Sequence, residues 1–142
     1  MSLSPHFTLS EFTRSTTADQ LGIDNTIPAA LVPNLRALCQ YVLEPLRAHV
    51  GHAITISSGY RCPQLNRAVG GVSNSQHQQG EAADLHLPSI EEGREWMRWI
   101  MDNCTFDQLL WERSGHTTWL HVSCKRDTSK NRHMVRSIMK RA

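Results

Sequence analysis

Two candidate metal ligands flank a glycine in the stretch Ser75-Gln76-His77-Gln78-Gln79-Gly80-Glu81-Ala82-Ala83-Asp84. The His77 imidazole and the Asp84 carboxylate are both ligands that Zn²⁺ accepts, and a third protein ligand would leave the fourth tetrahedral position free for water. Gly80 permits a tight turn between them. Because the chain contains 8 histidines and 13 acidic residues, a surface histidine followed by an aspartate in a turn is the alternative interpretation.

The residues that follow favour the metal interpretation. Residues 82–88 are predicted to form a short strand that ends at a proline. Successive side chains of a strand point to opposite faces, so Asp84 and His86 share one face. The candidate carboxylate ligand is therefore carried by a rigid element.

A second predicted strand, residues 118–124, supplies the third candidate ligand. Its apolar residues Leu120 and Val122 alternate with Trp119, His121 and Ser123, which indicates one face toward a core and the other toward a site. We therefore predict His121 as the third ligand. The alternative for a lone histidine on a strand is a half-buried side chain hydrogen-bonded to the backbone.

Together with several other short motifs, these residues resemble the zinc D-Ala-D-Ala carboxypeptidase family. That family belongs to a wider group of peptidoglycan metallopeptidases, which shares its zinc site with lysostaphin-type enzymes and with the amino-terminal domain of hedgehog proteins. The resemblance extends from His6 to Ser123. Its motifs are Ser58-Gly59-Tyr60-Arg61, Leu65-Asn66, Val69-Gly70-Gly71, Ser75-x-His77-x-x-Gly80-x-Ala82-x-Asp84 and Trp119-x-His121-x-Ser123.

The resemblance implies one bound Zn²⁺, held by His77, Asp84 and His121. It also implies that Arg61 lies in the active site and contacts substrate together with Ser75. A planar guanidinium can hold a peptide carboxylate or stabilise a developing oxyanion. The alternative is that Arg61 is an ordinary charged residue on the surface.

The general base is the position at which this sequence departs from the family. Many members have Glu or Asp three residues before the last histidine ligand, where this chain has Thr118. We predict Glu112 as the base and His116 as a second acid/base group or transition-state stabiliser. In the alternative, Glu112 pairs with an arginine and His116 is a mobile loop residue, so that the chain binds zinc but hydrolyses poorly.

Length and composition are those of one soluble globular domain. The chain has 142 residues, 39% hydrophobic and 20% charged, with a formal charge of +2, which does not favour nucleic acid as a partner. We expect residues 1–142 to form a single zinc peptidase domain, with an amino-terminal helix and loop (1–27) and a basic, solvated carboxy-terminal segment (125–142). We also expect a monomer.

No stretch reaches the roughly 20 apolar residues of a membrane span, and the amino terminus lacks the pattern of a secretory signal. We therefore expect the protein to be made in the cytoplasm. By analogy with phage lysins, we expect that it is encoded by a phage or prophage and released to the cell wall. The four cysteines, Cys39, Cys62, Cys104 and Cys124, have no Cys-x-x-Cys spacing and are expected to be free thiols.

The predicted elements indicate an α+β fold of the hedgehog/DD-peptidase type, with a mostly antiparallel sheet and helices packed on one side. Helices are expected after the capping box at Thr8, over 28–50 with kinks at Pro33 and Pro45, over 63–68 and over 89–103, the last burying Ile90, Met97, Ile100 and Met101. A loop is expected over 16–26 and a hairpin loop over 113–117. Strands are expected over 53–58, as a central strand, and over 106–112.

The function that these predictions favour is zinc-dependent hydrolysis of peptide bonds in the peptidoglycan stem peptide. D-amino-acid-containing bonds are the expected target, cut by a D-Ala-D-Ala carboxypeptidase or an endolysin-type peptidase. The alternative is a zinc-binding scaffold or virion module that keeps the peptidase fold with little or no activity.

Overall fold

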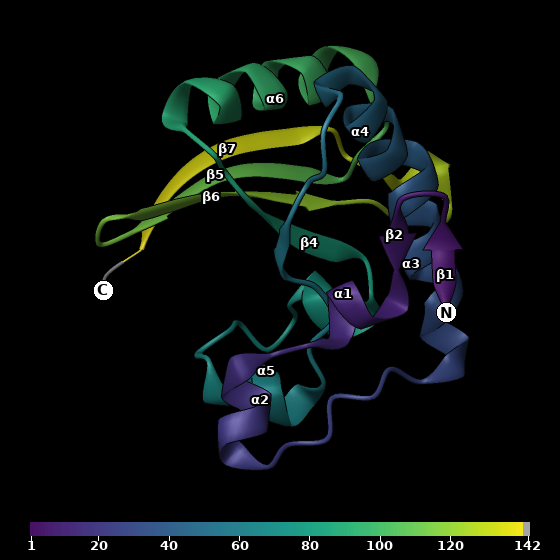
Figure 1. The fold of residues 1–142 in the computed structure, drawn as a ribbon, viewed down its shortest axis with the longest axis vertical. Coiled ribbons are helices and arrows are strands. Elements are labelled where there is room, and N and C mark those ends of the chain that lie inside the picture. The colour runs from purple at the N-terminus through teal and green to yellow at the C-terminus, as the bar shows by residue number, and fades with distance from the viewer. Residues whose placement is uncertain (141–142) are drawn as a thin grey trace.

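A five-stranded mixed sheet lies at the centre of the protein in the computed structural model, which describes residues 1–140 (Figure 1). The strand order is β3-β4-β6-β5-β7; only the β5–β7 pair is parallel among the pairs of this sheet within the described residues. The strands are β3 (Ile56–Ser58), β4 (Ala82–His86), β5 (Gln108–Ser114), β6 (Thr117–Ser123) and β7 (Met134–Lys140). The predicted α+β class with a mostly antiparallel sheet is confirmed.

Helical segments and a small ribbon surround this sheet. The ribbon pairs β1 (Ser2–Ser4) with β2 (Phe7–Thr8). The α-helices are α1 (Leu9–Thr13), α2 (Thr16–Leu21), α3 (Val32–Leu38), α4 (Glu44–Val50), α5 (Pro63–Ala68) and α6 (Ile90–Asn103). The shorter turns are η1 (Ala29–Leu31), η2 (Cys39–Leu43), η3 (Gln76–Gln79) and η4 (Thr128–Lys130). None of the helices within residues 1–140 is long and apolar enough to cross a bilayer.

The hydrophobic core lies on one face of the sheet, and the opposite face is left for polar side chains. Strands β4 and β6 contribute their alternate residues to this core, and α3, η2, α4 and α6 pack against them. The fully buried core residues include Leu35, Leu38, Val42, Leu46, Leu85, Ile100, Leu109, Leu120 and Val122. Because a strand alternates with a period of two, the residues between them are turned away from the core.

The helical segment over residues 32–50 is interrupted by a wide turn that accommodates a proline. Pro45 has no N–H, and its ring would clash with the carbonyl group four residues earlier in a regular α-helix. The chain forms the π-turn η2 just before it and continues as α4. The apolar stripe therefore stays on one side, with Leu35, Leu38, Val42 and Leu46 all buried.

Three predicted details are corrected by the structure. Residues 16–21 form helix α2 instead of a loop, since the Ser15 hydroxyl accepts a hydrogen bond from Ala18 N and caps the helix. The buried face of α6 contains Trp96 and Ile100, while Ile90 and Met101 are exposed. Strand β3 is shorter than predicted and lies at an edge of the sheet.

The carboxy-terminal segment is also different from the prediction of a solvated tail. Residues 134–140 form β7, which pairs with β5 over its whole length. Its start is attached by Arg132, whose guanidinium binds the fully buried Asp107 at 2.7 and 2.9 Å. Residues 141–142 of the predicted tail lie outside the described residues.

The predicted hairpin loop over 113–117 is a two-residue turn, because β5 and β6 extend to Ser114 and Thr117.

Candidate metal centre

His77 is presented by the short turn η3, which local hydrogen bonds define at both ends. The Ser75 hydroxyl accepts a hydrogen bond from His77 N at 3.2 Å and caps the turn. Gly80 ends it at φ +69°, a left-handed conformation that favours glycine. The predicted substrate-binding residue Ser75 therefore has a structural contact with the backbone of the ligand turn, and it also lines the adjoining cleft.

The backbone of the β3 exit orients the His77 ring. Its Nδ1 lies 2.6 Å from the carbonyl oxygen of Gly59. Because a carbonyl oxygen can only accept, Nδ1 donates this hydrogen bond and Nε2 is the ring nitrogen left for a metal ion. The free nitrogen of this buried histidine is thus the one that faces Asp84.

Asp84 and His121 are brought together by strand register. Asp84 on β4 is directly opposite His121 on β6, and side chains at directly opposite positions share one face. This face is the one turned away from the core, as predicted for both strands. Ala83 and Leu85, the neighbours of Asp84, are fully buried on the other face.

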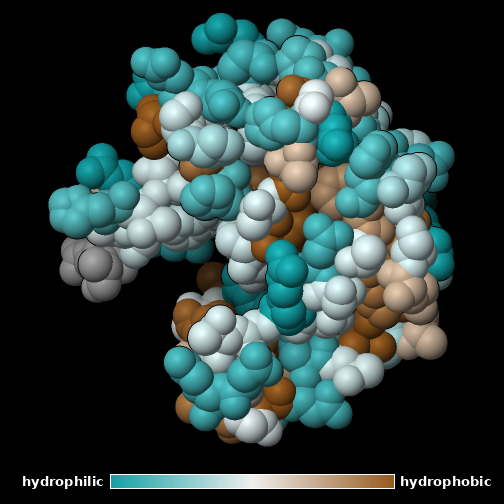
Figure 2. All heavy atoms as spheres, in the orientation of Figure 1, coloured by the Kyte–Doolittle hydropathy of each residue, from teal (hydrophilic) through white to brown (hydrophobic). Residues whose placement is uncertain are grey.

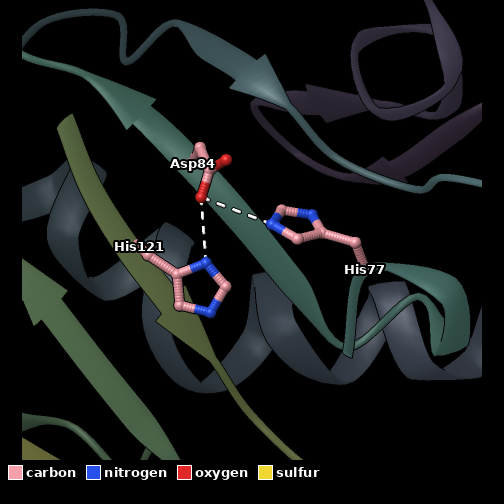
Figure 3. A group of neighbouring side chains, drawn as sticks. All are labelled: His77, Asp84 and His121. Carbon is pink, nitrogen blue, oxygen red and sulfur yellow. Dashed lines mark hydrogen bonds and ion pairs between the residues drawn. The ribbon is translucent and has the colours of Figure 1, made fainter. Parts of the chain in front are cut away.

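The three predicted ligands converge on one point (Figure 3). The Asp84 Oδ1 atom is 3.4 Å from His77 Nε2 and 2.9 Å from His121 Nδ1, and all three ligand atoms lie within 4.8 Å of one another. Ligands of a tetrahedral zinc ion with bonds near 2.0 Å are about 3.3 Å apart. The residues present therefore fit one metal ion held by two imidazoles and a carboxylate.

The charges around Asp84 keep its carboxylate ionised, which is the form that binds metal. Burial acts to raise the pKa of Asp84, but the adjacent His77 and the hydrogen bond to His121 outweigh it and hold the pKa far below its ordinary value.

Arg61 contributes a positive charge from the other side, with Nη2 3.6 Å from Asp84 Oδ2. Its guanidinium is mostly buried, which lowers its pKa, whereas Asp84 and Glu112 act in the opposite direction. Arg61 also donates to the side-chain oxygens of Ser58 and Asn66, so its plane is fixed beside the ligands.

Glu112, the predicted base, lies next to the candidate metal centre. It is opposite Trp119 on β6 and thus on the same sheet face as His121. Its Oε1 is 3.6 Å from His121 Nδ1, and its side chain is 4% exposed. Thr118 is an odd number of residues from His121 and belongs to the opposite face of β6.

The structure does not bring His116 to the other predicted site residues. It is an exposed residue of the two-residue turn between β5 and β6, roughly 16 Å along the strand direction from His121 at the usual rise per residue. Its acid/base role stays a prediction. His86 lies two residues after Asp84 on β4, and its side chain is exposed.

A cleft of about 760 Å³ opens over the ligands. Figure 2 shows the hollow between the projecting end of the β5–β6 hairpin and the part of the molecule that contains α2 and α5. One wall is the loop of residues 70–76, and the opposite wall includes Ile138 and Lys140 of β7. Its lining also includes Arg61, His77, Glu112 and His121.

Two features of the site were not predicted from the sequence. The first is the Gly59 carbonyl that orients His77, a backbone group that no side chain in the sequence reveals. Lys140, whose Nζ is 2.7 Å from Glu112 Oε2, was part of a segment interpreted as solvated. Residues 134–140 read Met-Val-Arg-Ser-Ile-Met-Lys, which lacks the period-two alternation of a half-buried strand, so the local pattern gave no signal for β7.

A search of known families gives one finding that bears on this site. The family model described as Peptidase M15 matches residues 5–123, which include all three ligands and Glu112. The match confirms the resemblance drawn from the motifs. No curated protein matches the chain.

Proposed function

Because the chain belongs to the peptidase M15 family, we propose that it is a zinc-dependent peptidase that hydrolyses peptide bonds in the peptidoglycan stem peptide. D-amino-acid-containing bonds are the proposed target, as in the D-Ala-D-Ala carboxypeptidases. Release to a cell wall, from a phage or prophage gene, is part of the same proposal. The family implies a peptide substrate, and the peptidoglycan identity is the step that needs an experiment.

One observation carries the proposal: His77, Asp84 and His121 converge at the floor of an open cleft, with a buried carboxylate beside them. Three protein ligands leave a fourth tetrahedral position, which is the ligand count of a catalytic zinc site. Because the cleft reaches the ligands, a peptide can approach that position. A structural zinc site would have four protein ligands and no access.

A zinc ion at these ligands would lower the pKa of a water molecule to about 7 and polarise the scissile carbonyl. Glu112 is placed to accept the proton that the attacking water loses, through the Oε1 atom that faces His121. The same carboxyl group then donates this proton to the amine that leaves, so that the peptide bond is replaced by a carboxylate and an amine.

Arg61 is the proposed contact for substrate charge. Its guanidinium is held beside Asp84 and faces the cleft, where its N–H groups can bind a carboxylate of the stem peptide or the oxyanion that develops on the carbonyl.

The test is digestion of purified peptidoglycan by the zinc-loaded chain, with the released fragments identified by mass. We expect new peptide termini that disappear when a chelator is added. Glu112→Gln should keep bound zinc and the folded state while kcat falls by about 100-fold or more. Glu95→Gln, the same change at an exposed position of α6, is the matched control and should leave kcat unchanged.

The same experiment separates the proposal from the alternative of an inactive scaffold. If the zinc-loaded chain releases no fragment from peptidoglycan, the peptidoglycan proposal fails and the scaffold interpretation gains support. If fragments appear and Glu112→Gln releases them at the original rate, the chain is a peptidase but Glu112 is not its base.

A further inference from the structure

We propose that Lys140, on the carboxy-terminal strand β7, is a positioning residue that holds the Glu112 carboxylate at the metal centre. The catalytic part of this inference rests on the function proposed above. Strand β7 lies beyond the residues 5–123 that match the family model, so this contact comes from a part of the chain outside that match.

Strand pairing delivers Lys140 to the site. Residues 134–140 of β7 pair in register with residues 108–114 of β5. Ile138 is directly opposite Glu112, and Lys140 follows two residues later on the same face. From there its side chain reaches back so that Nζ lies 2.7 Å from Glu112 Oε2.

Glu112 needs such a partner because its carboxylate is buried. Its side chain is 4% exposed, and a buried carboxylate is costly unless a charge or hydrogen bonds compensate it. Within residues 1–140, Lys140 is the one lysine or arginine with a nitrogen inside 4 Å of this carboxylate. The lysine side chain is itself 53% exposed, so it is the solvated end of the pair.

The two carboxylate oxygens of Glu112 have separate contacts. Oε2 is bound by Lys140, whereas Oε1 is 3.6 Å from His121 Nδ1. The ammonium group also lies 5.7 Å from the ring centroid of Trp119, the residue opposite Glu112 on β6. Lys140 is thus located by two contacts, and its bond to Oε2 sets the rotation that leaves Oε1 facing the ligands.

The attachment of β7 does not depend on Lys140. The segment that leads into it is fixed by the Arg132–Asp107 ion pair and by the hydrogen bond from Met134 N to Asp107 O at 2.8 Å. We therefore expect Lys140→Met to fold with β7 in place. This separates the loss of one ammonium group from the loss of a strand.

The first measurement is the thermal midpoint of the metal-free chain in a double-mutant cycle with Glu112→Gln, which needs no substrate. Lys140→Met should lower the midpoint by about 3 °C or more when Glu112 is present, and by clearly less when it is combined with Glu112→Gln. Equal shifts in both backgrounds would show that Lys140 does not hold Glu112, and would overturn the proposal.

The second measurement is steady-state hydrolysis by the zinc-loaded chain. Lys140→Met should lower kcat by about 10-fold or more with KM unchanged, and Lys140→Arg should restore most of the loss. Arg136→Met is the matched control, because Arg136 lies on the same strand and its guanidinium binds only the Val135 carbonyl in the contacts described. An unchanged kcat in Lys140→Met would overturn the positioning role.

Failure of the proposed function gives a different result. If the zinc-loaded native chain hydrolyses nothing, the peptidase proposal fails, and the thermal cycle alone decides whether Lys140 holds Glu112. Coupling between the two positions would then support the contact, and its absence would refute it.

Discussion

Replacing Gly59 by alanine should weaken metal binding without touching a metal ligand. A Cβ atom at this position would lie 2.6 Å from both Cα and the carbonyl oxygen of Phe12. These are backbone atoms, so one of the two chain segments must move. The Gly59 carbonyl is also the acceptor for His77 Nδ1 at 2.6 Å, and its movement loosens the bond that orients the ring.

Two magnitudes follow from these contacts. Forcing extra atoms into a well-packed interior costs about 1–3 kcal/mol of unfolding free energy. Disturbing the hydrogen bond to the second nitrogen of a metal-binding histidine costs about 10–100-fold in metal affinity. We expect both effects in Gly59→Ala.

Zinc affinity would be measured by competition with a chromophoric chelator, and stability by urea unfolding of the metal-free chain. Gly51→Ala is the control, since Gly51 has φ +82° but no atom within 4 Å of an added Cβ. It should lose about 1 kcal/mol through backbone strain while its zinc affinity stays the same. If Gly59→Ala binds zinc as tightly as the native chain, the Gly59 carbonyl does not set the orientation of His77.

Three further results are expected. His86→Ala should bind as much zinc as the native chain, measured by metal analysis of the purified protein. Alanine replacement of any one of the candidate ligands His77, Asp84 and His121 should remove most of the bound zinc. Burial acts to raise the pKa of Asp107, but hydrogen bonds from Arg132 and Gln76 outweigh it and hold the pKa below its ordinary value. The stability contributed by Asp107 is thus present above about pH 4 and lost as the pH falls through the lowered pKa. Asp107→Asn should lower the free energy of unfolding by about 1–3 kcal/mol at pH 7. Measured by urea unfolding, the stability of this variant should fall less steeply with decreasing pH than that of the native chain. A thiol reagent should modify Cys62 in the folded native chain, whereas Cys39, Cys104 and Cys124 are buried and should react only after unfolding. Burial also raises the pKa of Cys39 to about 12 and the pKa values of Cys104 and Cys124 to about 11, which keeps these thiols protonated.

The amino-acid sequence by itself determined the faces of the central strands. The alternation of Leu120 and Val122 with His121 has only one arrangement that buries the apolar side chains, and it turns His121 outward. The same reasoning places Asp84 on the outer face of β4. Local periodicity and the family motifs were therefore sufficient to predict the class of the fold and the three candidate metal ligands that the structure brings together.

Only the tertiary structure decided which groups surround those ligands. The Gly59 carbonyl, the Lys140 ammonium and the Arg132–Asp107 pair reach their places from segments distant in sequence. Long-range pairing brings them there, and it leaves little trace in a local pattern. Residues 134–140 lack period-two alternation and include basic side chains, so they resemble a solvated tail until β5 provides a partner. The tight β5–β6 turn likewise keeps His116 away from the site and leaves Glu112 beside it. The reason is that strand register, and not distance along the chain, determines which side chains lie close enough to share a site.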